Sequence, residues 1–144
     1  MIELKAVSKS FAGTQVLEPI DLIASAGRTT VLIGPSGCGK STLLRLMIGL
    51  IEPDAGEVLF EGRQLTSANA PALRHRMGYV IQDGGLFPHL TAGDNISLLA
   101  RHLGWDEEKI AARIETLVQL THFPADGLTR YPVQLSGGQQ QRVG

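Results

Sequence analysis

The sequence predicts an α/β protein, in which a part rich in strands precedes a helical part. Three observations carry this prediction. Residues 29–33 are β-branched and apolar on both faces, as a buried parallel strand is. A glycine-rich loop and a segment with apolar residues at helical spacing follow that strand directly. Because the pattern afterwards becomes helical, we expect an α/β part over about residues 1–82 and a helical part over about residues 83–144.

Length and composition favour one ordinary globular domain. Of the 144 residues, 43% are hydrophobic and 19% are charged, which excludes disordered and collagen-like chains. The formal net charge of -1 provides no broad basic surface, so we expect no nucleic-acid partner. No segment approaches the roughly 18 apolar residues of a membrane span, and the N-terminus lacks the pattern of a secretory signal. We therefore expect a cytoplasmic chain.

Four further segments complete the strand pattern. Residues 2–7 alternate apolar with polar side chains, and residues 16–23 do so loosely around Pro19, which is typical of half-buried strands in a small sheet. Residues 57–60 form a short apolar run after a turn rich in glycine and proline. Residues 77–81 are a second short apolar run, and we predict a strand for each.

Three helices follow from apolar spacing and capping residues. Residues 40–48 have apolar side chains at helical spacing, and Gly49 is a plausible stop. Thr91 predicts a helix start, since Asp94 stands at capping-box distance from it. Acidic residues at 106–108 predict another helix start, because the positive end of a helix dipole favours them. The buried stripe predicted for this last helix comprises Ile110, Ile114, Leu117 and Val118.

Residues 34–41 match the phosphate-loop pattern G-x-x-x-x-G-K followed by Ser or Thr at every fixed position, between the strand and the helix that the pattern requires. Glycines let backbone amides turn inward as an anion cradle, and the helix points its positive end at the same place. Lys40 adds a charge for the β and γ phosphates, and the Ser41 hydroxyl can ligate Mg²⁺. The predicted nucleotide-binding residues here are Gly34, Pro35, Ser36, Gly37, Cys38, Gly39, Lys40, Ser41 and Thr42.

Cys38 is the only cysteine, which excludes an internal disulfide and a multi-thiolate zinc site. It lies in the phosphate loop near the predicted helix start, where a thiolate is stabilised. We therefore predict that thiol alkylation blocks nucleotide binding and that Mg-ATP protects Cys38. The four histidines show no metal-binding spacing, so we expect them to be structural or solvated.

Residues 135–139 read LSGGQ and contain a second candidate anion site. Ser136 and Gln139 form the S-x-x-Q pattern of a capping box, which predicts a helix start. Capping alone does not explain the consecutive Gly137 and Gly138, because each costs a helix about 1 kcal/mol. Glycines let a ligand approach the backbone closely, so the segment combines a hydroxyl, bare amides and a helix N-terminus.

A phosphate loop followed by LSGGQ in one chain resembles the ATP-binding subunits of ABC transporters, and the resemblance covers essentially all of residues 1–144. It implies a P-loop NTPase core with an incomplete parallel sheet, a small antiparallel β subdomain and a helical subdomain. It also implies that two subunits sandwich Mg-ATP in a head-to-tail homodimer. In that dimer Ser136, Gly137, Gly138 and Gln139 of one subunit would face the phosphates held by the other.

The resemblance assigns roles to three further places. Phe11 corresponds to the aromatic residue that stacks on adenine, for which a flat π face is suited. Gln82 corresponds to the hinge glutamine that approaches the metal and the attacking water, so we assign it with Lys40 to catalysis and with Ser41 to the metal. Residues 86–91 would face the coupling helix of a transmembrane permease subunit. Such a subunit would hold the chain at the inner face of the cell membrane, with a substrate-binding protein as an indirect partner.

Two elements of the family have no match in residues 1–144. Hydrolysis needs an apolar strand ending in Asp-Glu and a later histidine, and residues 79–83 match the hinge better than that strand. In the family both elements follow LSGGQ. We therefore expect these residues to be a partial ABC ATPase domain with negligible hydrolysis, and to associate or be marginally stable because sheet edges are exposed.

Several segments look like those of importers for quaternary-amine osmoprotectants such as glycine betaine or choline, and Gly144 is one cue because that subfamily often has glycine there. An amino-acid or polyamine importer is the alternative cargo class. An ATPase of a nontransport ABC protein, and a nucleotide-binding fragment without turnover, also remain open. A P-loop GTPase is disfavoured because no aspartate has glycine three positions on, and a P-loop kinase because it needs no LSGGQ.

Overall fold

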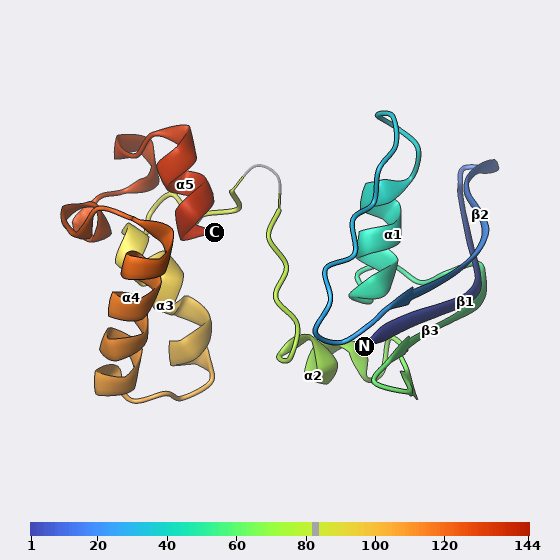
Figure 1. The fold of residues 1–144 in the computed structure, drawn as a ribbon, viewed down its shortest axis with the longest axis horizontal. Coiled ribbons are helices and arrows are strands. Elements are labelled where there is room, and N and C mark those ends of the chain that lie inside the picture. Colours follow the sequence, from blue (N-terminus) through green and yellow to red (C-terminus); the bar gives the residue numbers. More distant parts are fainter. Residues whose placement is uncertain (82–83) are drawn as a thin grey trace. The chain divides into compact units, whose positions relative to one another are not determined.

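The computed structural model describes residues 1–81 and 84–144 and divides into two compact units, Met1–Tyr79 and Val80–Gly144. The first unit contains the strands, and the second contains helices and 3-10 turns (Figure 1). Each unit has a hydrophobic core of its own.

The first unit is built on a sheet with the strand order β2-β1-β3-β4. Every pairing in it is antiparallel. The two long strands form a hairpin, and the first of them also pairs with the third. The strands are β1 (Ile2–Phe11), β2 (Thr14–Ala24), β3 (Ala55–Phe60) and β4 (Arg63–Gln64).

β1 is longer than the alternating pattern predicts, because a bulge interrupts its register after Leu4. Ala6 has a positive φ of 47°, and its amide donates to the Asp21 carboxylate at 2.8 Å. Gly56 on β3 passes so close to the bulge that a Cβ there would lie 2.3 Å from the Ala6 carbonyl oxygen. Only glycine therefore fits on β3 beside the bulge, and with glycine there β1 stays paired with both β2 and β3.

Helix α1 (Lys40–Met47) packs on the sheet through its apolar stripe and agrees with the predicted helix over 40–48. Gly49 follows it with a positive φ of 66°, as a glycine stop does. A short helix, α2 (Ala70–Arg74), comes after the sheet. The buried cluster shared by α1 and the strands comprises Leu4, Val7, Leu17, Leu43, Leu46, Met47 and Val58.

Two predicted strands are absent from the described part of the chain. Residues 29–33 and 77–81 carry no strand assignment, so the prediction of a strand at each place was wrong for this structure. Val31 is 70% exposed and Ile33 is 92% exposed, the opposite of a buried parallel strand. A strand requires a hydrogen-bonded neighbour, and in residues 1–81 and 84–144 no other strand pairs with these segments.

The second unit is helical in its described residues. Its elements are α3 (Ala92–His102), α4 (Glu107–Thr121), η1 (Ala125–Thr129), η2 (Pro132–Gln134) and α5 (Gly137–Val143). Its buried cluster comprises Ala92, Phe123, Leu135 and Val143. Across the described residues, no helix combines the length and the apolar character that a bilayer crossing requires.

Two predicted helix starts in this unit, at Thr91 and at residues 106–108, are confirmed. The Thr91 hydroxyl accepts a hydrogen bond from the Asp94 amide at 3.2 Å, and the Asp106 carboxylate accepts one from the Lys109 amide at 2.7 Å. The predicted stripe of α4 is only partly confirmed. Ile110 is 3% exposed, whereas the other three members are half-buried.

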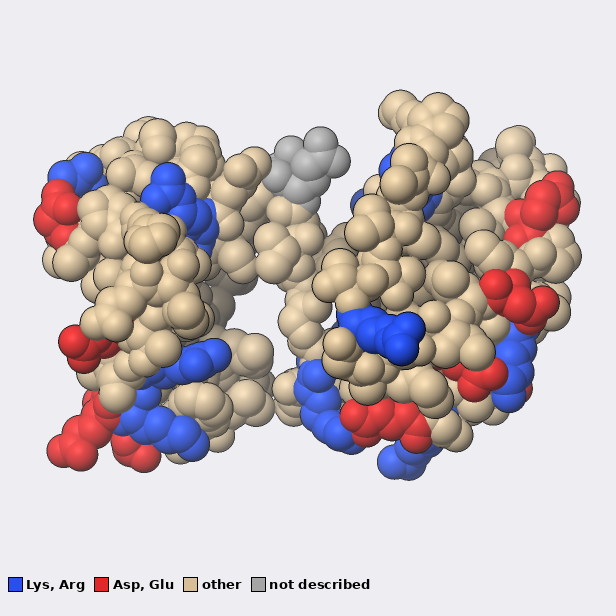
Figure 2. Space-filling model, in the orientation of Figure 1, with Lys and Arg blue, Asp and Glu red and all other residues tan. Residues whose placement is uncertain are grey.

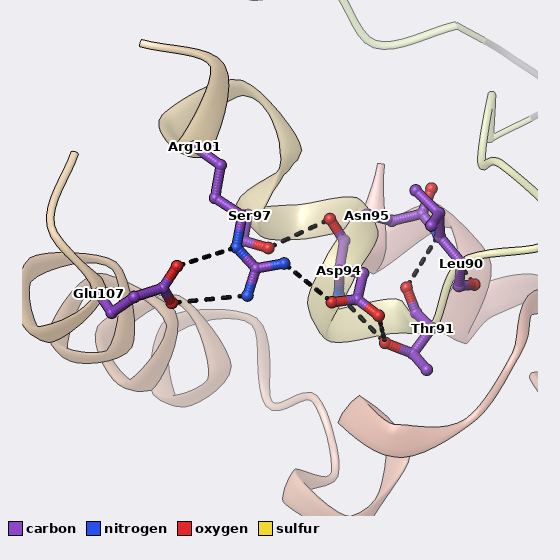
Figure 3. A network of polar contacts seen from close by, with 7 residues as sticks. All are labelled: Leu90, Thr91, Asp94, Asn95, Ser97, Arg101 and Glu107. Carbon is purple, nitrogen blue, oxygen red and sulfur yellow. Dashed lines mark hydrogen bonds and ion pairs between the residues drawn. The ribbon is translucent and has the colours of Figure 1, made fainter. Parts of the chain in front are cut away.

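An ion-pair network joins α3 to the start of α4 (Figure 3). The Arg101 guanidinium donates to Asp94 at 3.0 Å and to Glu107 at 3.2 Å. Asp94 also accepts from the Thr91 hydroxyl at 2.6 Å. These bonds, that from Thr91 first and that from Arg101 second, hold the pKa of Asp94 below its ordinary value.

Candidate functional site

The phosphate loop, residues 34–41, leads directly into α1. Gly37 and Gly39 have φ values of 83° and 90°, a region that side chains other than glycine rarely adopt. Gly39 is also buried, and a Cβ there would lie 3.0 Å from the Val16 carbonyl oxygen on β2. The local backbone therefore favours glycine at 39, which is a fixed position of the motif, and at 37, which is a free one.

The N-terminus of α1 is left open to an anion. Gly39 is its N-cap, and in the described chain neither a side-chain cap nor an acidic residue in the first turn neutralises the positive end. The first regular helical bond runs from the Leu43 amide to the Gly39 carbonyl at 2.8 Å. Amides before Leu43 have no i−4 partner within the helix, so they are available to an anion placed there.

Lys40 bends back over the loop. Its Nζ atom donates to the carbonyl oxygens of Gly34 at 2.8 Å and Pro35 at 2.7 Å, and it lies 3.4 Å from Cys38 Sγ. The ammonium group is therefore held beside the loop by the dipoles of two carbonyl groups. A polyanion that reached the loop could replace these carbonyls with charged oxygens, which bind an ammonium more strongly.

Beside Lys40 and Ser41 lies a shallow pocket of about 370 Å³, whose other lining residues are Thr30, Val31, Leu32 and Leu44. Ser41 is exposed, so its hydroxyl is accessible to a phosphate-bound metal. Among the residues that the structure describes, no group of three His, Cys, Asp or Glu side chains is placed to hold a metal ion by itself.

Cys38 is an exposed free cysteine at the outer part of the loop. Its Sγ atom lies 2.7 Å from where a Cβ on Gly34 would stand, so the thiol packs over the first glycine of the loop. An adduct on this sulfur would extend over the same backbone that the motif provides for phosphate.

Phe11 ends β1 at the tip of the β1–β2 hairpin. The two turn residues, Ala12 and Gly13, both have positive φ, 48° and 80°, which is the geometry of a tight two-residue hairpin. The ring is 46% exposed and has Lys9 Nζ 5.5 Å from its centroid. The sequence gives no signal for Lys9, because it lies beyond the alternating segment 2–7 and belongs to no motif.

The LSGGQ segment, residues 135–139, adopts the predicted capping box. Ser136 is the N-cap of α5; its hydroxyl accepts from the Gln139 amide at 3.3 Å, and the Gln139 side-chain oxygen accepts from the Ser136 amide at 2.9 Å. A Cβ added at Gly137 or Gly138 would meet nothing within 4 Å, and neither has a positive φ. Packing within the described unit therefore does not require these glycines. Their lack of side chains instead leaves room for a ligand or another chain to approach the backbone.

A further glutamine holds the backbone before this segment. Gln140 Nε2 donates to the carbonyl oxygens of Pro132 at 2.9 Å and Leu135 at 3.2 Å. One turn earlier, Gln134 accepts from the Tyr131 amide at 2.8 Å. Sequence reasoning missed both, although Y-x-x-Q repeats the spacing of the S-x-x-Q box and could have indicated the first of these two turns.

The loop over residues 86–91 is fastened to α3 by Asn95. The Asn95 side chain accepts from the Phe87 amide at 2.8 Å and donates to the carbonyls of Phe87, Leu90 and Thr91 at 3.2, 3.2 and 2.9 Å. Figure 3 shows the last two of these partners beside the start of α3. Phe87 is nevertheless 48% exposed, so the loop presents an aromatic side chain to solvent.

The predicted site residues thus fall into separate groups. Residues 34–42 lie together on one loop and helix start, and Phe11 belongs to the same unit. Ser136 and its neighbours belong to the other unit. Gln82 lies outside the described residues. On the face drawn in Figure 2, acidic and basic side chains are interspersed on each unit.

A protein-family model described as "ABC transporter" matches residues 17–144. The glycine betaine/carnitine/choline transport ATP-binding protein OpuCA of Bacillus subtilis is 43% identical over 145 residues, covering 100% of this chain and 38% of that protein. The glycine betaine uptake system ATP-binding protein YehX of Escherichia coli is 44% identical, covering 100% of this chain and 47% of its own length. The Fe(3+) ions import ATP-binding protein FbpC 1 of Rhodococcus jostii is also 44% identical, with 99% and 40% covered.

Among solved structures, the ATP-binding cassette MJ0796, in a dimeric post-hydrolysis state bound to ADP and Pi, matches with a TM-score of 0.91 and 30% identity. The match covers 99% of this chain and 66% of that one. The chain therefore spans about two fifths of the length of the curated relative OpuCA and about two thirds of the solved cassette.

Proposed function

The chain belongs to the ABC transporter family, and we propose that it is the ATP-binding part of an ABC importer, which binds Mg-ATP at residues 34–42. The observation that carries the proposal is the phosphate loop itself. Gly37 and Gly39 have positive φ values, Lys40 donates to two carbonyl oxygens of the loop, and the start of α1 is uncapped.

The residues present suit a nucleotide with bound magnesium. The loop amides and Lys40 would hold the phosphates, and the exposed Ser41 hydroxyl would ligate the metal. Mg²⁺ offsets the charge that the phosphates carry. Thr42, in the first turn of α1, would add its amide to the same anion site. Phe11, exposed at the hairpin tip, would offer a ring face to the adenine base.

A second copy would complete the site. We propose a head-to-tail homodimer in which Ser136, Gly137, Gly138 and Gln139 approach the phosphates held by the partner's loop. The open space around both glycines supports this arrangement, since nothing in their own unit requires them. The dimeric state of the solved cassette MJ0796 also supports it.

Hydrolysis is proposed for the intact subunit, with Lys40 and Gln82 in catalytic roles. ABC ATPases also use an Asp-Glu strand and a histidine that have no match in residues 1–144. We therefore propose that residues 1–144 alone bind nucleotide without appreciable turnover.

The proposed partners are permease subunits and, through them, a substrate-binding protein, which would place the chain on the inner face of the cell membrane. Residues 86–91, with Phe87 exposed on a loop held by Asn95, are the proposed contact with a permease. Osmoprotectants such as glycine betaine or choline are the proposed cargo, in line with the names of OpuCA and YehX. The ferric-ion importer FbpC 1 is equally similar, so ferric ion is the second candidate.

Isothermal titration of the folded chain with ATP and magnesium tests the central proposal. We expect saturable binding of one ATP per chain, weakened when magnesium is removed by a chelator. A folded chain that binds no ATP would refute the proposed function.

A further inference from the structure

Asp54, in the turn before β3, is bonded to three consecutive residues of β1. Its carboxylate accepts from Lys9 Nζ at 2.5 Å and from the Ser10 amide at 2.7 Å. Its own amide donates to the Ser8 carbonyl at 3.0 Å. The bond from Lys9, followed by that from Ser10, keeps the pKa of Asp54 below its ordinary value. This fastening ends one residue before Phe11.

Lys9, which pairs with Asp54, also contacts the ring of Phe11. Its Nζ lies 5.5 Å from the ring centroid, within the range of a cation–π contact. The Lys9 side chain is only 17% exposed, although it carries a charge, because Asp54 pairs with it. The ring itself stays 46% exposed. A cation therefore lies over the ring, and much of the ring surface still faces solvent.

A ring at the tip of a hairpin loses rotamer freedom when a ligand stacks on it, which weakens binding unless the ring is already held. The bonds at Ser8, Lys9 and Ser10 restrain the backbone that leads to Phe11, and the ammonium restrains the ring. The contact between Lys9 and Phe11 does not serve the hydrophobic core, because Phe11 is not among the buried residues of its unit.

We propose that Asp54 and Lys9 are positioning residues for base recognition: they hold the Phe11 ring so that one side is covered by the ammonium and the other receives the adenine base. The inference rests on the proposed function, in which Phe11 stacks on ATP. It predicts that substitutions at Asp54 or Lys9 weaken the contribution of the base to ATP affinity and leave the contribution of the phosphates unchanged.

The chain contains a matched arrangement that lacks the open ring. Arg76 pairs with Glu61 at 2.6 Å and lies 5.4 Å from the Phe60 ring centroid, but Phe60 is only 8% exposed. The side chains of Glu61 and Asp54 are equally exposed, at 44%. Glu61→Gln therefore removes an ion pair of the same kind in the same unit without touching Phe11.

The test compares two ligands, ATP and inorganic tripolyphosphate, both with magnesium, by isothermal titration of the full chain. Lys9→Met and Asp54→Asn should each weaken ATP binding by about threefold to tenfold. Tripolyphosphate affinity should stay within about twofold, the usual scatter of a surface substitution. Lys9→Arg should restore the ATP affinity, because guanidinium also pairs with a carboxylate and stacks on a ring. Glu61→Gln should change neither ligand.

Phe11→Ala distinguishes the stacking of Phe11 on the base from the positioning of its ring. If it lowers ATP affinity selectively and Lys9→Met and Asp54→Asn do not, the positioning role is wrong and the proposed function stands. If it leaves the ratio of the two affinities unchanged, stacking by Phe11 is wrong and the positioning role fails with it. Equal weakening of ATP and tripolyphosphate by Lys9→Met would show a structural role only and would also overturn the inference. Should Asp54→Asn unfold the chain, Lys9→Met decides alone, because it leaves the bond between Asp54 and the Ser10 amide in place.

Discussion

The ammonium group of Lys40 donates a 2.7 Å hydrogen bond to the carbonyl oxygen of Pro35, five residues earlier in the same loop. A second bond of 2.8 Å goes to Gly34. The loop thus keeps its lysine within reach of the place where the proposed function puts the β and γ phosphates. Binding would exchange two carbonyl partners for charged phosphate oxygens, and the contribution of Lys40 to ATP affinity depends on that exchange.

Lys40→Ala should weaken ATP binding by more than about tenfold, because a charge-assisted contact contributes about 1.5–3 kcal/mol. Isothermal titration with magnesium measures the change. Lys5→Ala is the matched control, since Lys5 is a lysine of the same unit whose ion pairs are with Glu3 and Glu57. Unchanged ATP affinity in a folded Lys40→Ala chain would contradict the assignment of the loop.

Alkylation of Cys38 should block ATP binding, because the exposed thiol packs over Gly34 and lies beside Lys40 Nζ. Saturating Mg-ATP should slow the labelling, and Cys38→Ser should bind ATP with or without the reagent. Mass spectrometry of the labelled chain over time gives the rate. Equal rates with and without Mg-ATP would count against a nucleotide at this loop.

Gly39→Ala should lower the free energy of unfolding more than Gly62→Ala does. Both positions have positive φ, 90° and 78°, so both substitutions strain the backbone. Only at Gly39 would the new Cβ also meet backbone, 3.0 Å from the Val16 carbonyl oxygen, whereas at Gly62 it would meet nothing within 4 Å. Crowding of this kind costs about 1–3 kcal/mol, and urea unfolding measures the difference. Equal losses would show that β2 yields to the added methyl.

Gly137→Ala should stabilise the chain and impair the proposed dimer. Alanine in a helix is favoured over glycine by about 0.5–1 kcal/mol, and here the added Cβ would meet nothing within 4 Å. The same methyl would stand where the partner's phosphates approach. Urea unfolding and light scattering with Mg-ATP measure the two effects, with the exposed Gln141→Ala on the same helix as control. Normal ATP-driven association of Gly137→Ala would refute the trans role of the segment.

Acid should loosen the link between α3 and α4. The lowered pKa of Asp94 means that its carboxylate is more stable in the folded than in the unfolded state, so this stabilisation is complete above the ordinary aspartate pKa of about 3.9. It is lost as the pH falls through the lower folded pKa. Thermal unfolding of wild type and Asp94→Asn should therefore differ at pH 6 and converge as the pH falls below about 4. A difference that is independent of pH would show that Asp94 acts through shape alone.

Local chemistry made much of this molecule predictable. Thr91, Asp106 and Ser136 cap helices as the sequence indicates, because a cap is decided within three or four residues. The α/β class is confirmed by the likeness to the solved ABC cassette. Gly39, a fixed glycine of the phosphate loop, has a positive φ of 90°, a conformation that favours glycine.

Contacts between distant residues were beyond the sequence pattern. The apolar run at 29–33 predicted a buried strand, but a strand also needs a neighbour, and composition alone does not supply one. Asp54 and Lys9 are 45 positions apart, and neither belongs to a motif. The bond from Gln140 in α5 to Pro132 in η2 forms only once both of these elements have formed.

Asn95 gives the loop before α3 a mechanical property. Four hydrogen bonds from one side chain tie the backbone at Phe87, Leu90 and Thr91 to the first turns of the helix. These bonds hold the loop and the start of α3 together as one piece. Arg101, in the last turn of α3, bonds both to Asp94 in the first turn and to Glu107 in the first turn of α4, so side-chain bonds connect the loop, both ends of α3 and the start of α4.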